Sequence, residues 1–402
     1  MFLPDGEPLF MTYDLDPSTF LAQIQVQMPT YSNPIAPPIF QTSTFAAEDA
    51  QSFANMATEP LHAGFYTRYG NPTTRAFEDA VTALEGGGAG LATASGMAAV
   101  VATLLTFVAS GEHVVAQRVL YGGTTGFLKN VAPRLGIEVS FVDQIDTAAF
   151  LDAVRPMTRL IILESPSNPM MRLTDLAAIA DFANRAGIAT FVDNTIASPL
   201  NQRPISMGVD LVMHSATKYL AGHSDVSAGI VVGSKEKISA IWEKAYILGA
   251  TLDPFAAWLA LRGLRTLPMR IARHNDTAMR VATFLAQHSQ VEAVHYPGLP
   301  SHAQHDLARR QMTGFGGVLS FEVKGGAVEA EKVVSNLHLA HRSASFGSFS
   351  TLVVHPAAMW AGMMSAEQLR DADLPANLIR LGVGFEAPEA LIADLDGALA
   401  SL

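Results

Sequence analysis

Short apolar runs that alternate with helix-like segments, from about residue 85 to residue 235, constrain the fold of this chain more than any other feature. Seven runs have the length of a strand and are largely apolar: 90–93, 113–116, 137–142, 160–163, 189–192, 211–213 and 230–232. Continuous apolar strands that alternate with helices are typical of a mainly parallel sheet covered by helices on both faces. The sequence therefore predicts one large α/β domain around a mainly parallel seven-stranded sheet.

The helix predicted between the fourth and fifth runs carries the clearest local signals. Thr174 has the hydroxyl side chain of an N-cap, and Gly187 has the conformational freedom that ends many helices. Between them, apolar residues recur at helical spacing on one face: Leu176, Ile179, Ala180 and Ala183.

The flanking regions predict two further parts. Residues 1–65 show little periodicity and many prolines, so we expect an N-terminal arm that becomes ordered by contact with another surface. A helical stretch over 255–287 leads to strand candidates at 318–323 and 378–383 and to further helices. We therefore expect a large domain over 66–255 and a smaller α+β C-terminal domain over 256–402.

Composition excludes several classes of protein. A net charge of −11 argues against nucleic acid or an anionic membrane as a partner. The chain has no cysteine, which excludes disulfides, thiolate metal sites and a cysteine nucleophile. The N-terminal stretch lacks the features of a signal peptide, and Met11 is a second candidate for the natural start. The longest apolar stretch, 97–109, is too short to span a bilayer, so we expect a cytoplasmic protein with a buried helix there.

One lysine stands at the end of a predicted strand. The apolar run 209–213 leads through His214 and small residues to Lys218. A surface lysine after a buried strand is the ordinary interpretation. The chemical interpretation is a Schiff base to an aldehyde cofactor, which requires a lysine whose pKa is lowered by burial and by neighbouring cations.

Other predicted strand ends carry residues that suit the same kind of cofactor. Small residues around Gly96 and Met97 open a helix whose N-terminus can bind phosphate, unless this is only a capped turn. Asp193 follows a buried strand and can hold a pyridinium nitrogen protonated; a metal ligand or an N-cap are the alternatives. Ser215 and Thr217 flank the lysine and offer hydroxyls to the phosphate. Since strand ends of an open α/β sheet share one edge, we expect these residues to converge.

Two arginines and one loop complete the set of candidates. Arg68 lies between two tyrosines before a turn and has the fork geometry that binds phosphate, although a plain turn is the alternative. Arg380 lies inside an apolar strand, where a charge must be paired, and a substrate carboxylate would satisfy it. The proline-stiffened loop after the run 160–163 carries Asn168.

Several motifs together resemble a known family: YTRYGNPT, ATASGMAA, LYGGT, ESPSNP, FVDNT, HSATKYLAGHSDV and IRLGVGFE. The resemblance is to the Cys/Met-metabolism family of pyridoxal-phosphate enzymes, which includes cystathionine γ-synthases and γ-lyases, methionine γ-lyases and homoserine-ester sulfhydrylases. It covers the chain from about residue 34 onward. It implies the PLP-dependent transferase fold of type I and pyridoxal 5′-phosphate as cofactor.

The resemblance also implies residue roles and an assembly. Lys218 would bind the cofactor covalently and move protons, and Tyr121 would stack on the ring and is a candidate acid or base. The phosphate would be held by Gly96, Met97, Ser215 and Thr217, with Tyr66 and Arg68 from a neighbouring subunit, while Asp193 would pair with the ring nitrogen. The substrate carboxylate would be held by Asn168, Ser345 and Arg380. The expected assembly is a homotetramer, a dimer of dimers that share active sites; no metal is expected.

The chain departs from every subfamily at positions expected near the distal end of a substrate. Gly123 stands where methionine γ-lyases typically carry cysteine, and Ser350 stands near a position that is usually charged. Trp360 and Ala361 replace a usual threonine-histidine pair. Loss of charge near Ser350 argues against cystathionine and favours a compact neutral side chain, such as that of methionine or a homoserine ester; an atypical γ-substituted substrate is the alternative.

The predicted function is γ-elimination on a sulfur amino acid such as methionine, giving a 2-oxo acid, ammonia and a thiol. The alternative is γ-replacement, as in O-acetyl- or O-succinylhomoserine sulfhydrylases and cystathionine γ-synthases. An aminotransferase of the same fold would need a 2-oxo acid as second substrate. A binding protein without catalysis is disfavoured because buried charges such as Arg380 are retained.

Overall fold

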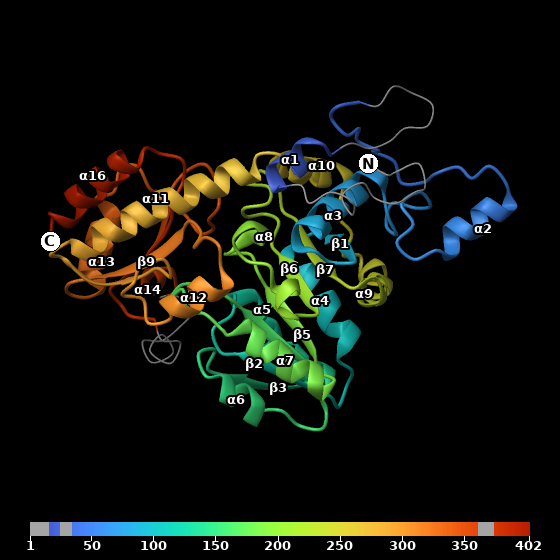
Figure 1. Cartoon of the computed structure of the whole chain (residues 1–402), viewed down its shortest axis with the longest axis horizontal. Coiled ribbons are helices and arrows are strands. Elements are labelled where there is room, and N and C mark those ends of the chain that lie inside the picture. Colours follow the sequence, from blue (N-terminus) through green and yellow to red (C-terminus); the bar gives the residue numbers. More distant parts are fainter. Residues whose placement is uncertain (1–15, 25–33, 361–373) are drawn as a thin grey trace.

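The computed structural model describes residues 16–24, 34–360 and 374–402. Met11, Ala361 and much of the predicted N-terminal arm lie outside the described residues. Within the described ranges, no helix is both long enough and apolar enough to cross a membrane. Figure 1 shows two lobes, one around each of two sheets, joined by the long helix α11 (Leu267–Gln287).

The larger lobe is built around the predicted seven-stranded sheet. Its strands, in the order in which they lie side by side, are β1 (Ala89–Thr93), β7 (Gly229–Gly233), β6 (Leu211–His214), β5 (Ala189–Asp193), β4 (Thr158–Glu164), β2 (His113–Gln117) and β3 (Glu138–Val142). Strand β7 pairs antiparallel with both neighbours, and the other pairs are parallel. The predicted mainly parallel α/β sheet is confirmed.

Alternating side chains of these strands enter two different apolar cores, which explains why the strands are apolar throughout. In β4, Leu160 and Ile162 pack in the core beneath α4 (Gly96–Phe107) and α9 (Lys235–Leu248). Ile161 and Leu163 face the opposite core, which contains the apolar face of α7 (Leu176–Ala186). Helices α5 (Gly122–Asn130) and α6 (Thr147–Asp152) complete the two layers.

The predicted start of α7 is corrected by one residue. The N-cap is Asp175, whose carboxylate accepts a hydrogen bond from the Ala178 amide, and not Thr174. Thr174 is fully buried, and its hydroxyl donates to Gln117 beneath the sheet edge. Gly187 ends the helix with a positive φ of 67°, as predicted.

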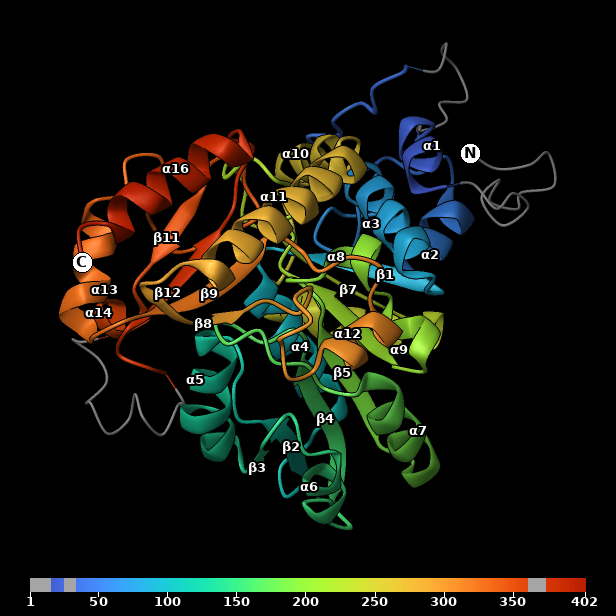
Figure 2. The same cartoon turned by 60° about the vertical axis from the view of Figure 1, so that its left-hand side comes forward.

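The smaller lobe contains a five-stranded sheet in the order β10 (His341–Arg342), β11 (Leu352–Val354), β12 (Leu378–Gly382), β9 (Val318–Val323) and β8 (Val291–His295). Helices α11, α13 (Ala327–Ser335) and α16 (Pro388–Leu399) contribute to its apolar core (Figure 2). Short helices α12 (His305–Gln311) and α14 (Pro356–Trp360) lie in its connections.

The helical stretch predicted over 255–287 is two helices, because the chain breaks at Arg265 and Thr266 between α10 (Pro254–Leu264) and α11. Helix α10 packs in the same core as α3 (Pro72–Glu85) of the larger lobe. The domain boundary near residue 256 stays a prediction; α10, which spans it, shares a core with the larger lobe.

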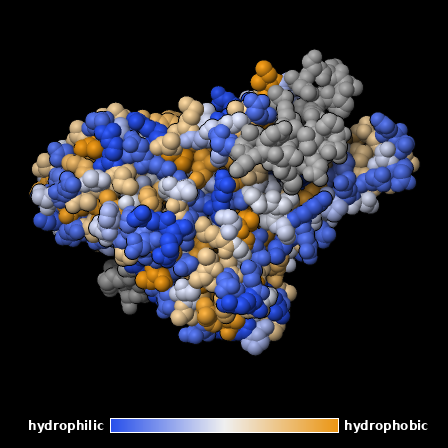
Figure 3. All heavy atoms as spheres, in the orientation of Figure 1, coloured by the Kyte–Doolittle hydropathy of each residue, from blue (hydrophilic) through white to orange (hydrophobic). Residues whose placement is uncertain are grey.

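The described part of the N-terminal region contains two helices that the sequence did not predict, α1 (Pro17–Ala22) and α2 (Ala50–Thr58). Both are capped by aspartates, Asp16 and Asp49. Helix α2 buries none of its residues and extends away from the larger lobe in Figure 1. The space-filling view shows polar residues over most of this face of the molecule, with apolar residues in small groups among them (Figure 3).

Candidate active site

The carboxyl ends of the central parallel strands border a cavity of about 250 Å³. The residues predicted for the site that line it are Gly96, Met97, Tyr121, Asn168, Asp193, Ser215, Thr217 and Lys218. They come from several connections of the sheet, which meet because parallel strands end at the same edge. We call Asp193, Ser215, Thr217 and Lys218 the floor of the cavity.

The first turn of α4 forms one side of the cavity. Ser95 caps this helix, and its hydroxyl accepts a hydrogen bond of 3.1 Å from the Ala98 amide. A Cβ atom at Gly96 would lie 3.1 Å from the Ser215 Cβ, so glycine lets the helix start approach the floor closely. The first N–H groups of a helix have no acceptor within the helix, and the dipole is positive there. This side of the cavity therefore suits an anion.

The hydroxyls of the floor differ in how they are engaged. The Ser215 amide donates to the Thr195 hydroxyl over 2.8 Å, which fixes the backbone there. The Thr217 hydroxyl donates to the Ala228 carbonyl over 3.2 Å and accepts from the Ala228 amide over 3.0 Å. Thr217 therefore has to release that carbonyl before it can donate to an anion.

Asp193 ends β5 and carries the carboxylate of the floor. Its Oδ1 accepts hydrogen bonds from both the amide and the hydroxyl of Thr195. Burial raises the pKa of Asp193, against the effect of these two hydrogen bonds. A cationic partner in the cavity would stabilise its ionised form, as a protonated pyridine nitrogen does.

Lys218 lies in the turn after β6 and points across the cavity. Its Nζ donates a hydrogen bond of 2.8 Å to the Ser345 hydroxyl in the smaller lobe. Burial, and secondly the charge of Arg380, lower the pKa of Lys218. Both effects favour the neutral amine that nucleophilic attack requires.

Arg380 of β12 faces the lysine from the smaller lobe. It is 6% exposed, and burial lowers its pKa to about 10, so it stays a cation at neutral pH. Its Nη2 donates to the Ser345 carbonyl over 2.6 Å, and its Nη1 to the Asn168 side-chain oxygen over 3.3 Å. Its Nε is buried without a hydrogen-bond partner. Ser345 and Arg380 do not line the cavity themselves but contact Lys218 and Asn168, which do; we call the pair the wall. A buried cation with an unused donor suits a carboxylate ligand.

Ser345 has a φ of 96°, in the left-handed region that serine rarely adopts. This conformation lets its hydroxyl accept from Lys218 while its carbonyl accepts from Arg380. The wall and the floor are therefore joined through one strained residue.

Tyr66 and Arg68 do not line this cavity. The Arg68 guanidinium donates to the Tyr246 carbonyl over 3.2 Å and lies 5.6 Å and 5.1 Å from the ring centres of Tyr66 and Tyr69. A single chain thus does not bring these two residues to the floor. Their role across a subunit interface stays a prediction.

Glu164 lines the cavity and was not predicted as a site residue. It ends β4 directly opposite Asp193, and burial, followed by the charge of Asp193, raises its pKa to about 8. The signal that identified Asp193, an acidic residue after a buried apolar strand, is also present at Glu164. Phe346, which follows Ser345, was missed because nothing in its local pattern points to a site.

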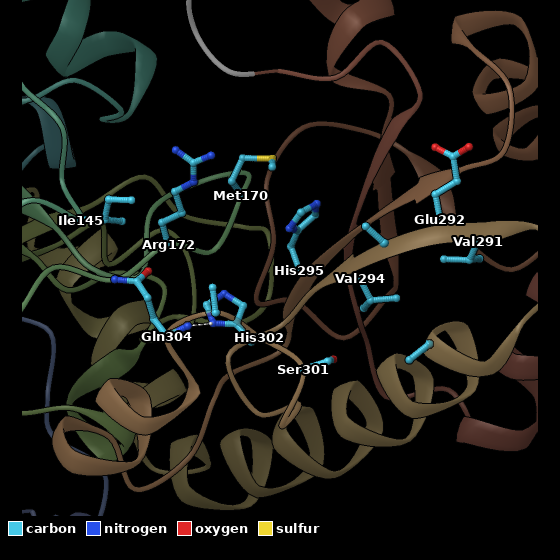
Figure 4. Close-up of a pocket in the computed structure, with 13 residues that line it drawn as sticks. Ile145, Met170, Arg172, Val291, Glu292, Val294, His295, Ser301, His302 and Gln304 are labelled. Carbon is cyan, nitrogen blue, oxygen red and sulfur yellow. Dashed lines mark hydrogen bonds between the residues drawn. The ribbon is translucent and has the colours of Figure 1, made fainter.

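A second cavity, of about 610 Å³, lies between the lobes and is shown in Figure 4. Met170 and Arg172 border it on one side, and His295 of β8 projects toward them from the other. His295 is hydrogen-bonded to Glu322 over 2.7 Å, and the His302 ring accepts from the Gln304 amide over 3.2 Å. The polar groups here are used within the protein, so this cavity is a weaker candidate than the floor.

Over the part of the chain that the structure describes, no three His, Cys, Asp or Glu side chains are grouped so as to hold a metal ion. The fold and the cavity instead define a class: an α/β enzyme of the type I fold of pyridoxal-phosphate enzymes, with a buried lysine at a strand end. Residues 18–400 match the model of the family described as Cys/Met metabolism PLP-dependent enzymes, and the chain belongs to that family.

Curated relatives carry three kinds of name: L-methionine gamma-lyase, O-succinylhomoserine sulfhydrylase and cystathionine gamma-synthase. The chain is 42% identical to an L-methionine gamma-lyase of Porphyromonas gingivalis, over 92% of this chain and 93% of that protein. It is 39% identical to an O-succinylhomoserine sulfhydrylase of Pseudomonas aeruginosa, over 90% of each chain. A solved cystathionine gamma synthase of Xanthomonas oryzae pv. oryzae superposes with a TM-score of 0.90 at 35% identity, covering 96% of this chain and 98% of that one.

The family uses pyridoxal 5′-phosphate, and the cavity fits this cofactor. An anion seat at the start of α4 lies against Ser215, so that phosphate can bind between them. The cavity also offers a lysine with a lowered pKa for the aldehyde and a carboxylate for the ring nitrogen.

Proposed function

We propose that the protein eliminates the γ-substituent of a sulfur-containing amino acid such as methionine. With one water, methionine gives 2-oxobutanoate, ammonia and methanethiol. The observation that carries the proposal is the hydrogen bond of 2.8 Å from the Lys218 amine to Ser345, beside the buried Arg380. It places a proton carrier next to a seat for a carboxylate.

The cofactor would be held by the floor and by α4. Gly96, Met97, Ser215 and Thr217 are proposed to bind its phosphate, and Asp193 to keep its ring nitrogen protonated. When bound, pyridoxal 5′-phosphate supplies an electron sink for the bond that breaks at the substrate α-carbon.

The wall orients the substrate. Arg380 can direct its unused Nε toward a carboxylate, and the Asn168 side chain and the Ser345 carbonyl lie beside the guanidinium. A carboxylate fixed here turns the α-hydrogen of the amino acid toward Lys218. The Lys218 Nζ, whose pKa burial lowers, would then accept that proton and return it to a carbon further along the chain.

Tyr121 is proposed to cover the cofactor ring and to give or take a proton at its hydroxyl. Its side chain is 54% exposed in the single chain, at the open side of the cavity. A Cβ at Gly122 would lie 3.2 Å from the Trp360 ring, so the indole approaches the segment that carries Tyr121. Trp360 adds no charge to this region, which supports a neutral substrate side chain such as methylthioethyl.

The second candidate function is γ-replacement. In this reaction a thiol adds to the γ-carbon of the same intermediate, which water would otherwise hydrolyse. This alternative is supported by two relatives: the O-succinylhomoserine sulfhydrylase named above and a cystathionine gamma-synthase 1 of Arabidopsis thaliana, which is 40% identical. Both functions share the floor and the wall, and they differ in whether a second substrate is needed.

A substrate panel tests the proposal. Methionine, cystathionine, homocysteine and both homoserine esters are incubated with the protein, with and without sulfide, and 2-oxo acid, ammonia and thiol are measured. We expect 2-oxobutanoate and methanethiol from methionine without added sulfide. Strict dependence on sulfide would establish replacement instead. Faster turnover of cystathionine than of methionine would contradict the preference for a neutral substrate side chain.

For the assembly we propose a homotetramer, a dimer of dimers with shared sites, in the cytoplasm. Exposed apolar side chains next to the Arg68 partner Tyr246 support self-association there: Ile247 is 68% exposed and Leu248 50%. In such a dimer, Tyr66 and Arg68 of one chain would reach the phosphate of the other. The division into an arm (1–65), a large domain (66–255) and a C-terminal domain (256–402) is likewise our proposal.

A further inference from the structure

Glu164 occupies a central position that the proposed mechanism does not use. It is 4% exposed, lines the cavity, and lies opposite Asp193 across the β4–β5 pair. Gln117 fixes its backbone with two hydrogen bonds of 2.9 Å, one to the Glu164 carbonyl and one from its amide. The carboxyl group therefore projects from a rigid point of the sheet edge.

Both oxygens of this carboxyl group bind backbone amides of other cavity residues. Oε2 accepts from the Tyr121 amide over 2.7 Å, and Oε1 accepts from the Asn168 amide over 3.1 Å. Tyr121 and Asn168 belong to different connections of the sheet and are brought together through this one side chain. A carboxyl group can accept a hydrogen bond at each of its oxygens, so this one side chain can hold two separate connections.

Each bridged residue leads to a different face of the cavity. The Tyr121 ring lies over Gly123, where a Cβ would come within 2.7 Å of the ring Cε1 and 2.9 Å of the Met97 sulfur. The Asn168 side chain accepts from Arg380 over 3.3 Å. One carboxyl group therefore connects the aromatic residue above the floor with the arginine of the wall.

We propose that Glu164 is a positioning residue, which holds Tyr121 and Asn168 in register so that the aromatic cover and the carboxylate seat act on one substrate. Glu164 hydrogen-bonds the backbone amides of Tyr121 and Asn168 and not their side chains, so it acts through their backbones. The roles given to Tyr121 and to the Asn168–Arg380 pair rest on the proposed function, whereas the hydrogen-bonded bridge through Glu164 does not.

The test is hydrogen–deuterium exchange at single amides of the apoprotein, combined with kinetics of the holoenzyme. Glu164→Ala removes both acceptors, so exchange at Tyr121 and Asn168 should accelerate by about tenfold or more. Glu164→Gln keeps one acceptor oxygen and turns an NH₂ toward the other amide, so one of the two amides should accelerate. Amides within β4 should keep their protection.

The kinetic readout separates positioning from a merely structural role. In Glu164→Ala, KM for the amino acid should rise and kcat should fall, each by roughly tenfold. The loss should be less than additive with Asn168→Ala, because both substitutions disturb the same seat. A lower melting temperature with unchanged KM and kcat would assign Glu164 to stability alone and overturn the proposal.

Glu112 provides a matched control. Its Oε2 accepts from the Ala109 amide over 2.8 Å just before β2, at the edge of the sheet opposite to the cavity. Glu112→Ala should accelerate exchange at Ala109 and leave KM and kcat unchanged. If Glu164→Ala does not fold, the wild-type apoprotein decides: unprotected amides at Tyr121 and Asn168 would contradict the bridge. Absence of thiol release would contradict the proposed function and leave the exchange result valid.

Discussion

The floor and the wall of the cavity are built in different ways. The floor residues follow buried parallel strands, and their positions are set by the sheet and by local hydrogen bonds such as that between Asp193 and Thr195. The wall depends on a left-handed Ser345 and on Arg380, buried inside an apolar strand of the other lobe. The two meet where Lys218 donates to Ser345. The floor is therefore suited to hold the cofactor, and the wall is suited to bind the carboxylate of the substrate.

Asp193→Ala should give a very large loss, because it removes the carboxylate that the floor offers to the ring nitrogen. We expect kcat to fall by more than about a hundredfold, corresponding to ~3 kcal/mol. Steady-state rates with methionine measure it. Asp210→Ala is the control: Asp210 precedes β6, binds Thr190 and Lys237 at the opposite edge of the sheet, and should leave kcat per folded molecule intact. Near-normal rates in Asp193→Ala would mean that another group protonates the ring.

Arg380→Ala should affect the wall more strongly than the floor. Loss of a buried cation that binds a carboxylate should raise KM by about thirtyfold or more, while the absorption spectrum of the bound cofactor should hardly change. Arg280→Ala, at an exposed ion pair with Glu389, should change neither quantity. If the cofactor spectrum changed as strongly as KM, the division between floor and wall would be wrong.

A mixing experiment tests whether the floor is complete within one chain. Arg68→Ala and Lys218→Ala are each expected to be inactive. A hybrid dimer with one chain of each variant should contain one intact shared site. Co-refolding equal amounts should restore about a quarter of the wild-type activity in a two-fold dimer. Mixing Lys218→Ala with Asp193→Ala should restore none, because both defects lie in the same chain's contribution. Recovery in the second mixture, or none in the first, would contradict shared sites.

The smallest expected effect concerns the apoprotein and pH. Glu164 is protonated in the folded state up to about pH 8, whereas a glutamate in the unfolded chain releases its proton near its ordinary pKa of 4.5. The folded state therefore binds more protons in this window, and its stability should fall as pH rises from about 5 to 8. Urea unfolding should show a weaker decline in Glu164→Gln. An equal slope in both proteins would place the pKa of Glu164 near its ordinary value.

The floor was predictable because its signals are local. Asp193 and Lys218 each follow an apolar run, and the meeting of strand ends at one edge is a property of parallel sheets. The wall was only partly predictable: an arginine inside an apolar strand marked Arg380, but its contact with Asn168 joins residues 212 positions apart across two lobes. No local pattern specifies how two lobes dock.

Other differences have similar physical causes. Thr174 and Asp175 are both good caps, and the choice fell on Asp175 because the Thr174 hydroxyl bonds to Gln117 in the interior. Strand β8 was missed because Glu292 and His295 interrupt its apolar pattern at the edge of the smaller sheet. Glu164 was missed although it carries the same signal as Asp193.

One measurement tests directly whether a covalent cofactor link at Lys218 organises this cavity. The holoenzyme is reduced with borohydride, digested, and mapped by mass spectrometry. We predict a pyridoxyl phosphate label on the peptide that contains Lys218 and nowhere else in stoichiometric amount. A label on another lysine, or none on this peptide, would contradict the account.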